Sequence, residues 1–542
     1  MNILIGGAWP YANGSMHIGH IAALLPGDVL ARYFRLKGDS VIYVSGSDCH
    51  GTPISIRAKE EGISPQEIAD KYHNEFCMCF DSLGFSYDYY TKTTTEYHKN
   101  FVEDFIKKLF DNGSLYEKET LQVYCEKCDK FLPDRYVDGI CPICGSDARG
   151  DQCDNCGSLL EPEMLKEMRC SLCNSQPILK PSTQLYINII RLQKELTEYV
   201  YCHKDWRTNA QNLSRRYIEE GLQDRAITRD LDWGTDVPVA GYKNKKIYVW
   251  IDAVLGYLSA CKKFCENKQI DFYEFWNSSQ HYYVHGKDNI PFHTIILPSL
   301  LLSYGNLHLP DEIISSEYVT LEGKKISTSK NWAVWIDYLI EKYDPDLIRY
   351  FFITNGPEKR DTNFSWLEFI NSNNGELLGA YGNFVNRTLV FINKYFDNKI
   401  PKGTINGELK EKTNQLFVSA GDKIEKGNFK DSLDEIFEFV RSSNKYYDAE
   451  KPWVTRVTDP EKCNSTIFNC VQIIANLSVL LNPFLPFSSS KIQNWLSISS
   501  ISANWCIKFV ESGLVIPTVD ILFKRIDKKV IDEEIKNLSN FV

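Results

Sequence analysis

The sequence lacks an apolar run that is long enough to cross a membrane. Its most apolar stretches, TIILPSLLLSYG and IIANLSVLLNPFLPF, are short and interrupted by proline. The chain does not open with a basic segment followed by an apolar one, so no secretory signal is visible. Low-complexity tracts are missing too. These absences predict a folded protein of the cytoplasm.

An excess of positive charge is also missing. The 542 residues include 61 Lys and Arg and 71 Asp and Glu, a formal net charge of −10. This balance argues against a protein that coats nucleic acid through bulk electrostatics, although it leaves room for a local basic surface. Hydrophobic residues make up 43% of the chain, which is enough to form the cores of three or four domains.

Cysteine, by contrast, is abundant and clustered. Eight of the 17 cysteines form four Cys-x-x-Cys pairs. The pairs are Cys125/Cys128, Cys141/Cys144, Cys153/Cys156 and Cys170/Cys173. Two such pairs make one tetrahedral thiolate site, so four pairs predict two structural zinc ions in a reducing compartment rather than disulfides. The spacing alone allows three ways of combining the pairs.

Alternating strand-like and helix-like segments predict a parallel α/β domain that is split by an insertion. The alternation runs from NILIGG to about Gly113 and resumes with KKIYVWIDAVLGYLSAC. Between these parts, a cysteine-rich segment extends from about Leu115 to Pro181, and a helical stretch follows to about Gly221. From about Trp366 onward, segments such as SLDEIFEFVRSSNKYYD repeat with a period of 3.6 and predict a helical bundle.

The segment AWPYANGSMHIGH places His17 and His20 where a buried strand passes into a helix. The helix is expected to kink at Pro26 and to end at Lys37-Gly38. Free N–H groups and the positive end of the helix dipole suit an anion there, above all a phosphate. Taken alone, two histidines at this spacing also fit an ordinary polar helix face or a metal pair.

A second motif, GKKISTSKN at 323–331, has the glycine, lysines and hydroxyl residues of a phosphate loop, although a solvated loop can have them too. Together, PYANGSMHIGH and KISTS resemble the two signatures of the class I aminoacyl-tRNA synthetases, HIGH and KMSKS. The second signature matches at Lys325, Ser327 and Ser329. It departs at Thr328, where the family has a second lysine. Lys324 or Lys330 is our candidate for the missing charge.

Five further segments resemble the methionyl-tRNA synthetases within this class. They are GSDCHGTPI, FLPDRYVDGICPICG, TRDLDWG, YVWIDAVLGY and YYVHGKDNIPFHTIILP. The resemblance covers Asn2 to about Asp527. It implies that ATP, with Mg²⁺, activates L-methionine to methionyl-adenylate, and that methionine then passes to the 3′ end of initiator and elongator tRNA(Met).

The resemblance also implies a split Rossmann-type parallel sheet with a zinc-knuckle insertion, followed by an all-α anticodon-binding bundle. The halves of the Rossmann catalytic domain are expected at 1–115 and 236–321, with the insertion at 116–235. A stem-contact region that includes the KMSKS loop is expected at 322–375, and the anticodon-binding domain at 376–542. The segment ILFKRIDKK resembles the family's returning C-terminal peptide. No dimerising module follows it, so a monomer is expected.

Roles for single residues follow from the same resemblance. The catalytic residues that it implies are His17, His20 and Lys325. The ATP-binding residues that it implies are His17, His20, Gly286, Lys287, Asp288, Lys325, Thr328 and Lys330. Asp48 holds the methionine ammonium, and the thioether pocket is lined by Tyr11, Trp250, Ala253, Tyr257, Phe292 and His293. Without the resemblance, the aromatic residues read as core packing. Trp9 stands where the family more often has leucine.

The resemblance reaches the helical part and the cysteines as well. Asn383, Arg387 and Trp453 match the positions that read the CAU anticodon, although Asn383 and Arg387 alone fit a solvated helix face. Among the three cysteine combinations, the resemblance favours the nested one. It joins Cys141, Cys144, Cys153 and Cys156 in an inner site, and Cys125, Cys128, Cys170 and Cys173 in an outer site.

Two other functions stay open from the sequence. One is a different class I specificity, but the valine, leucine and isoleucine enzymes carry a larger editing insertion, and the cysteine enzyme uses a catalytic zinc. The other is a tRNA-binding paralogue that lost its activity with Thr328. The presence of His17, His20, Asp48 and Lys325 argues against that loss.

Overall fold

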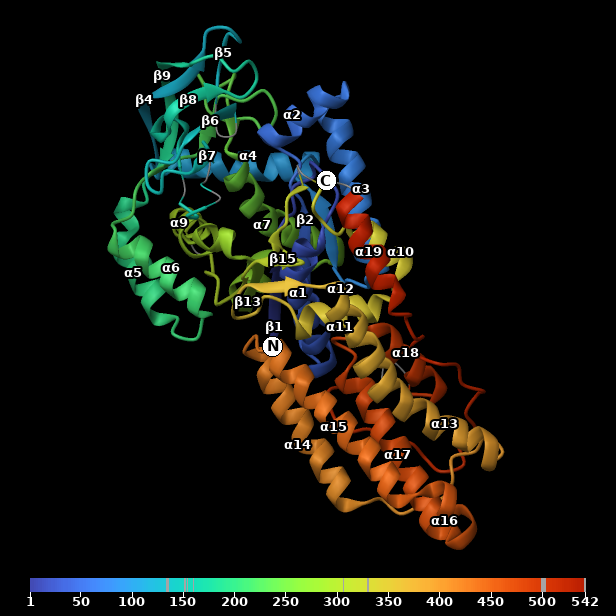
Figure 1. Cartoon of the computed structure of the whole chain (residues 1–542). Helices are drawn as coiled ribbons and strands as arrows, with labels where there is room; N and C mark the ends of the chain where they lie inside the picture. Colours follow the sequence, from blue (N-terminus) through green and yellow to red (C-terminus); the bar gives the residue numbers. More distant parts are fainter. Residues whose placement is uncertain are drawn as a thin grey trace.

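The structure is a computed structural model that describes residues 1–132, 136–150, 153, 155–158, 160–305, 307–328, 331–498 and 504–540. A five-stranded parallel sheet with the order β14-β13-β1-β2-β3 forms the centre of its N-terminal part (Figure 1). The strands are β1 (Asn2–Gly7), β2 (Ser40–Ser47), β3 (Tyr89–Lys92), β13 (Ser279–Gly286) and β14 (Glu312–Ser316). The strand order reverses at β1, and open α/β sheets bind ligands beyond the carboxyl ends of the strands at such a point.

Helices cover both faces of this sheet, as the alternating pattern predicts. They are α1 (Ile18–Lys37), α2 (Thr52–Glu61), α3 (Pro65–Ser82), α4 (Glu96–Asp111), α7 (Val249–Lys268), α8 (Phe272–Ser278), η4 (Lys287–Asn289), η5 (Phe292–Ile296) and α9 (Leu297–Tyr304). Because side chains alternate along a strand, Ile3 and Ile5 of β1 belong to the core that contains α1, whereas Leu4 belongs to the core that contains α4, α7 and α9. The carboxyl end of β1 is therefore fixed from both sides.

Helix α1 carries the first motif and runs as predicted from Ile18 to Lys37. Gly38 ends it in the left-handed conformation with φ of 92°, and its N–H donates to the Arg35 carbonyl. The helix continues through Pro26 without interruption.

The insertion contains two antiparallel sheets, which lie beyond the five-stranded sheet on the side away from the bundle (Figure 1). One has the order β10-β9-β4-β5, and the other β7-β6-β8. The elements are β4 (Leu115–Cys125), β5 (Lys130–Phe131), β6 (Val137–Ile140), β7 (Asp147–Arg149), η2 (Pro162–Met164), β8 (Lys166–Cys170), β9 (Ile178–Ile187), η3 (Ile190–Leu192), α5 (Gln193–Cys202), α6 (Thr208–Glu219) and β10 (Arg225–Ala226). A short pair, β11 (Thr228–Arg229) and β12 (Lys246–Ile247), leads back to α7.

One sequence prediction is wrong here. The residues after Pro181 were expected to be helical, but β9 continues to Ile187 and pairs with β4 along its whole length. Pro181 is tolerated because β10 pairs only with Tyr186 and Ile187, so the second edge of β9 needs no N–H at Pro181. The helices of the insertion begin only at Gln193 of α5, apart from the short η3.

The C-terminal part begins with a small sheet and continues as a bundle of helices (Figure 1). The sheet contains β15 (Val319–Leu321), β16 (Lys324–Lys325) and β17 (Thr362–Phe364). The helices are α10 (Ile336–Lys342), α11 (Pro345–Thr354), α12 (Trp366–Asn371), η7 (Ser372–Gly382), α13 (Asn383–Tyr395), α14 (Gly407–Glu425), α15 (Phe429–Glu450), α16 (Pro452–Thr458), α17 (Pro460–Leu480), α18 (Pro486–Trp495) and α19 (Lys529–Asn540).

Helix α17 departs from the expectation that no segment could cross a membrane. By length and composition alone it is long and apolar enough to do so, but 83% of its most apolar window is buried inside the structure. It packs against α13, α14, α15, α16 and α18. The apolar run is therefore the core of the bundle.

Helix α19 is an element that the sequence patterns did not predict. It returns from the bundle to lie beside α10 and α12 (Figure 1). Its Glu534 is 2% exposed and accepts hydrogen bonds from the hydroxyls of Tyr338 (2.6 Å) and Tyr343 (2.8 Å). These bonds satisfy a buried carboxylate and fix the end of the described chain.

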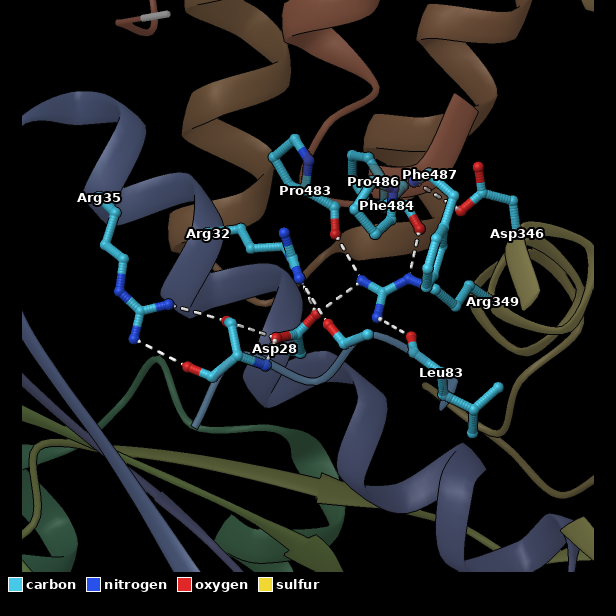
Figure 2. A network of polar contacts seen from close by, with 12 residues as sticks. Asp28, Arg32, Arg35, Leu83, Asp346, Arg349, Pro483, Phe484, Pro486 and Phe487 are labelled. Atoms are coloured by element: carbon cyan, nitrogen blue, oxygen red, sulfur yellow. Dashed lines mark hydrogen bonds and ion pairs between the residues drawn. The ribbon is translucent and has the colours of Figure 1, made fainter. Parts of the chain in front are cut away.

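A buried arginine joins the sheet domain to the bundle (Figure 2). The guanidinium of Arg349 on α11 donates to the carbonyls of Phe484 (2.8 Å), Pro483 (2.9 Å) and Leu83 (3.1 Å). It also lies 2.7 Å from the carboxylate of Asp28 on α1, and both side chains are 0% exposed. Three segments that are distant in sequence therefore meet at one charged group.

A half-buried arginine makes a similar link on another side of the bundle. The guanidinium of Arg207, just before α6, donates to the carbonyls of Ser315 at the end of β14 (3.1 Å) and of Gly427 in the turn between α14 and α15 (2.9 Å). The insertion, the sheet and the bundle are thus tied together at this point.

We expect Arg349→Met to destabilise the protein by about 3–5 kcal/mol, because buried Asp28 would keep only one of its two arginine partners, Arg32, and three buried carbonyls would lose their donor. The measurement is the shift in urea and thermal unfolding of the full chain. Lys37→Met is the matched control: Lys37 also connects α1 to the bundle, through Glu425, but both side chains are more than one-third exposed (37% and 34%). Its loss should cost less than about 1 kcal/mol. Equal effects of the two variants would contradict the prediction.

Candidate functional site

The first turn of α1 holds the two histidines of the HIGH motif in one arrangement. His17 Nδ1 accepts the N–H of Gly19, and His20 Nδ1 accepts the N–H of His17, each at 3.1 Å. The ring centroids lie 4.1 Å apart. Because each Nδ1 is an acceptor, each ring carries its proton on Nε2. Burial lowers the pKa of His20 to about 4 and the pKa of His17 well below its ordinary value, so both are neutral donors.

The expectation of free N–H groups at this helix end is wrong. The N–H of Ile18 donates to the carbonyl of Val334 (3.0 Å), that of Gly19 to the His17 ring, and that of His20 to the His17 carbonyl (2.9 Å). The Nδ1 atoms of the two histidine rings accept the backbone N–H groups of His17 and Gly19, so the donors left at this helix end are the Nε2–H groups of the rings. Any anion at this end meets imidazole rather than backbone.

The second motif is connected directly to the first. The N–H of Ile336 donates to the carbonyl of Met16 (2.9 Å), and Trp335 forms a β-bridge with His17. Closer to the motif, Ser327 and Trp332 exchange two backbone hydrogen bonds of 2.9 Å. The segment that follows the second motif therefore lies beside the first turn of α1, and the loop of the motif is closed by the pair Ser327 and Trp332.

Lys325 stands on the hairpin of β15 and β16. The turn residues Glu322 and Gly323 have φ of 47° and 77°, the left-handed pair that two-residue hairpins require. Lys325 is exposed and has no partner among the described residues, whereas the ammonium of Lys324 lies 4.7 Å from the ring centre of Trp332. Thr328 is exposed. Ser329 and Lys330 lie outside the described residues.

The expected nucleotide residues 286–288 follow β13 at its carboxyl end. Lys287 Nζ donates to the carboxylates of Glu317 (2.7 Å) and Asp361 (2.9 Å) and lies 3.8 Å from the ring centre of Tyr318. Although burial acts to lower it, the pKa of Lys287 is raised by these two carboxylates. Asp288 accepts the hydroxyl of Tyr318. Both side chains are therefore tied to the strand that leads to the second motif.

All seven residues expected to bind methionine line one cavity of about 140 Å³. They are Tyr11, Asp48, Trp250, Ala253, Tyr257, Phe292 and His293. Within it, the rings of Trp250 and Phe292 lie 4.2 Å apart, and Tyr257 Oη lies 2.9 Å from Nε2 of His293. Burial lowers the pKa of His293 to about 4, so the ring is neutral. Ala8, Trp9, Val254 and Asn289 also line the cavity.

Trp9 shapes the wall of this cavity in a way that two glycines make possible. A Cβ atom at Gly46 of β2 or at Gly256 of α7 would lie 2.5 Å from the Trp9 ring. The indole therefore fills the space that side chains at these two positions would need. In the sequence, the signal for this close contact was the presence of glycine inside a strand, at Gly46, and inside a helix, at Gly256.

A buried network behind Asp48 escaped the sequence reasoning. Asp252 is 0% exposed and accepts hydrogen bonds from Thr235 (2.8 Å), His50 Nδ1 (2.7 Å) and His98 Nε2 (3.2 Å). Although burial acts to raise it, the two imidazoles lower the pKa of Asp252 below its ordinary value. Burial and then the Asp252 charge raise the pKa of Asp48, which is 4% exposed. A cation beside Asp48 would favour its charged form and so lower the pKa that burial and Asp252 raise.

The eight paired cysteines come together as two groups of four, in the nested combination. Within each group the sulfur atoms lie within 4.8 Å of one another. The groups are Cys125, Cys128, Cys170 and Cys173, and Cys141, Cys144, Cys153 and Cys156. Four thiolates at this separation fit a tetrahedral Zn²⁺. Ser175 Oγ lies 3.2 Å from Cys125 Sγ and 3.0 Å from Cys173 Sγ, where its hydroxyl can donate to metal-bound thiolates.

The three expected anticodon residues come from α13 and α16, and α16 lies at the end of the bundle away from the central sheet (Figure 1). Asn383 is exposed at the first position of α13, and Arg387 lies one turn later. The Arg387 guanidinium lies 4.0 Å from the ring centre of Tyr447 and donates to Asp448 (2.8 Å). Trp453 is 49% exposed and stacks on the same tyrosine at 6.0 Å. The structure therefore brings Arg387 and Trp453 together.

Two family models match successive parts of the chain. A model of the family described as tRNA synthetases class I (M) matches residues 3–389. A second, described as the anticodon binding domain of methionyl tRNA ligase, matches residues 400–540.

Similar proteins match nearly the whole chain. Methionine–tRNA ligase 1 of Alkaliphilus oremlandii is 56% identical over 540 residues, which covers 99% of this chain and 100% of the relative. A methionine–tRNA ligase of Bacillus mycoides is 54% identical, with 99% of each chain covered. The crystal structure of Mycobacterium tuberculosis methionyl-tRNA synthetase bound by methionyl-adenylate has the same fold, with a TM-score of 0.80 at 20% identity and coverage of 97% and 100%.

We expect two zinc ions per chain when the protein is purified without added metal, because both four-cysteine groups are complete. Elemental analysis measures the content. Cys173→Ser should lower the value toward one, whereas Cys202→Ser, which changes an exposed cysteine outside both groups, should leave it at two. A value near one in the unaltered protein, with Cys125 and Cys128 titrating as free thiols, would show that the outer group holds no metal.

Proposed function

The chain belongs to the class I methionyl-tRNA synthetases, and from this premise we propose a role for each part of its site. It is an ATP-dependent ligase that activates L-methionine to methionyl-adenylate and transfers methionine to tRNA. The observation that best supports the assignment of residues is the single cavity that collects all seven expected methionine residues next to the segment that leads into the HIGH motif.

Asp48 accepts the ammonium group of methionine. Its carboxylate is buried beside a second carboxylate, Asp252, so it gains most from a bound cation. Tyr11, Trp250, Ala253, Tyr257, Phe292 and His293 enclose the thioether. Sulfur–aromatic contacts contribute about 0.3–1.5 kcal/mol, and an unbranched, polarizable chain suits such a lining.

His17 and His20 stabilise the α-phosphate while the methionine carboxylate attacks it. Because both rings are neutral, their Nε2–H groups donate hydrogen bonds without taking part in proton transfer. Lys325 adds the positive charge that these neutral donors lack, and the pyrophosphate leaves toward it. Gly286, Lys287, Asp288, Thr328 and Lys330 complete the ATP site. Mg²⁺ that accompanies ATP neutralises charge on the leaving phosphates.

The two four-cysteine groups hold structural Zn²⁺. Their support is the set of four thiols in each group and the Ser175 hydroxyl beside the outer one. In each group all four positions are filled by cysteine, so no position is left for a substrate. The ions stabilise the insertion, 116–235, near the acceptor end of tRNA.

The helical domain, 376–542, reads the anticodon of initiator and elongator tRNA(Met) through Asn383, Arg387 and Trp453. The Rossmann halves, 1–115 and 236–321, activate methionine, and 322–375 positions the tRNA stem and the second motif. The exposed Trp453, stacked on Tyr447, supports a contact with an unpaired base. We expect the enzyme to act as a monomer in the cytoplasm.

ATP–pyrophosphate exchange with each of the twenty amino acids tests the function. Methionine alone should support exchange at low concentration. Exchange with another amino acid would indicate a different class I specificity. No exchange with any of them would indicate a tRNA-binding paralogue without catalysis.

Lys325→Ala should slow adenylate formation by at least about tenfold with little change in the KM for methionine. A charged hydrogen bond contributes about 1.5–3 kcal/mol, and this contact is made chiefly in the transition state. Pre-steady-state adenylation and methionine titration measure the two effects. A rise in KM with an unchanged rate would contradict the role.

Alanine variants at Lys324 and Lys330 identify the charge that compensates for Thr328. We expect the larger effect at Lys330, because Lys324 is held over Trp332. If both variants match the unaltered enzyme and Thr328→Lys strongly accelerates adenylation, the loop has no compensating lysine.

A further inference from the structure

A second pair of a cation and an aromatic ring lies beside the residues assigned to the anticodon. The guanidinium carbon of Arg456 on α16 lies 4.2 Å from the ring centre of Tyr395 on α13, and Lys394 Nζ lies 5.2 Å from the same ring. Tyr395 is 39% exposed, and Arg456 is exposed. No carboxylate of the described residues forms an ion pair with Arg456. Its charge is therefore available to a partner.

This pair continues the surface formed by Arg387 and Trp453. Arg456 follows Trp453 by three residues, so the two side chains lie on one face of α16. Tyr395 follows Arg387 by eight residues, about 12 Å along α13. The end of the bundle that carries α16 is remote from the central sheet (Figure 1). The two cation–aromatic pairs thus lie near each other on one exposed end of the molecule.

The chemistry of the pair suits unpaired RNA. An exposed aromatic ring stacks a base of any sequence, and an arginine beside it binds a phosphate or a base plane. The two arginines differ in what surrounds them. Arg387 is paired with Asp448, which suits a hydrogen-bonded contact with a base edge, whereas the uncompensated charge of Arg456 suits a phosphate.

We propose that Arg456 and Tyr395 form a second RNA contact, which binds the sugar–phosphate backbone and a stacked base of the anticodon loop next to the nucleotides assigned to Asn383, Arg387 and Trp453. This inference rests on the proposed function, because it assumes that the anticodon loop reaches this end of the bundle. The contact adds affinity for the loop without reading its sequence.

The test measures binding of the full-length enzyme to a tRNA(Met) transcript and to a short RNA hairpin with the anticodon CAU, over a range of salt concentrations. Arg456→Ala should weaken binding by about three- to tenfold and reduce the slope of log K against log salt by about 0.7–1, the value for one lost phosphate contact. Arg456→Lys should keep the slope. Arg456→Ala should weaken the binding of hairpins with altered anticodons by the same factor, because the contact does not read the sequence.

The ring is tested in the same way. Tyr395→Phe should bind as the unaltered enzyme does, whereas Tyr395→Leu should weaken binding with the slope unchanged, because stacking carries no charge. Lys108→Ala is the matched control. It removes a cation that lies 3.4 Å from the ring centre of Tyr304 in the sheet domain, away from this surface, and it should change neither quantity.

Three outcomes would count against the inference or against the proposed function on which it rests. Unaltered affinity and slope in Arg456→Ala, with the thermal midpoint retained, would overturn the inference. A concentration-dependent dimer in sedimentation that Arg456→Ala abolishes would also overturn it and assign the surface to a second copy of the chain. If Trp453→Ala also leaves binding of the CAU hairpin unchanged, the proposed anticodon assignment itself fails.

Discussion

A buried guanidinium needs partners for its five N–H groups, and Arg349 finds them only when three separate segments meet. Its ion pair with Asp28 lies in the middle of α1, whose first turn carries His17 and His20. The helix that carries the two histidines, which we propose as phosphate donors, is therefore fixed to the bundle at the same time. Arg207 makes a similar connection, because its guanidinium donates to the carbonyls of Ser315 in the sheet domain and Gly427 in the bundle. These two arginines connect the sheet domain, with the proposed adenylation site, to the bundle that carries the proposed anticodon residues.

The rigid part of the adenylation site supplies donors without charge. His17 and His20 are neutral because desolvation lowers the pKa of each ring, and their Nδ1 atoms are already engaged with the backbone of the same turn. In the proposed mechanism, positive charge comes from Lys325, which stands on an exposed two-stranded hairpin. Dipoles that are fixed in advance need no reorganisation during the reaction, whereas a charge at the surface avoids the desolvation that burial would cost.

Sequence reasoning succeeded where a local pattern decides the structure. The short apolar run NILIGG and the end signal Lys37-Gly38 of α1 predicted those elements, and the resemblance predicted the nested cysteine groups and the residues that share the cavity. It failed where a distant partner decides. The strand β9 depends on its ladder with β4, and Asp252 depends on His50 and His98. Only the three-dimensional arrangement shows that the histidine rings occupy the backbone donors of α1.

The net charge of −10 raises the question of how the enzyme holds an RNA. Many cations at its functional regions are already neutralised: Lys287 by Glu317 and Asp361, Arg349 by Asp28, and Arg387 by Asp448. Lys325 and Arg456 have no carboxylate partner among the described residues. Because the formal net charge is −10, we expect nonspecific attraction to phosphates to stay weak, so that contacts with bases supply more of the binding free energy. An acidic protein of this kind is expected to discriminate among RNAs, because without those contacts its net charge would oppose the binding of any of them.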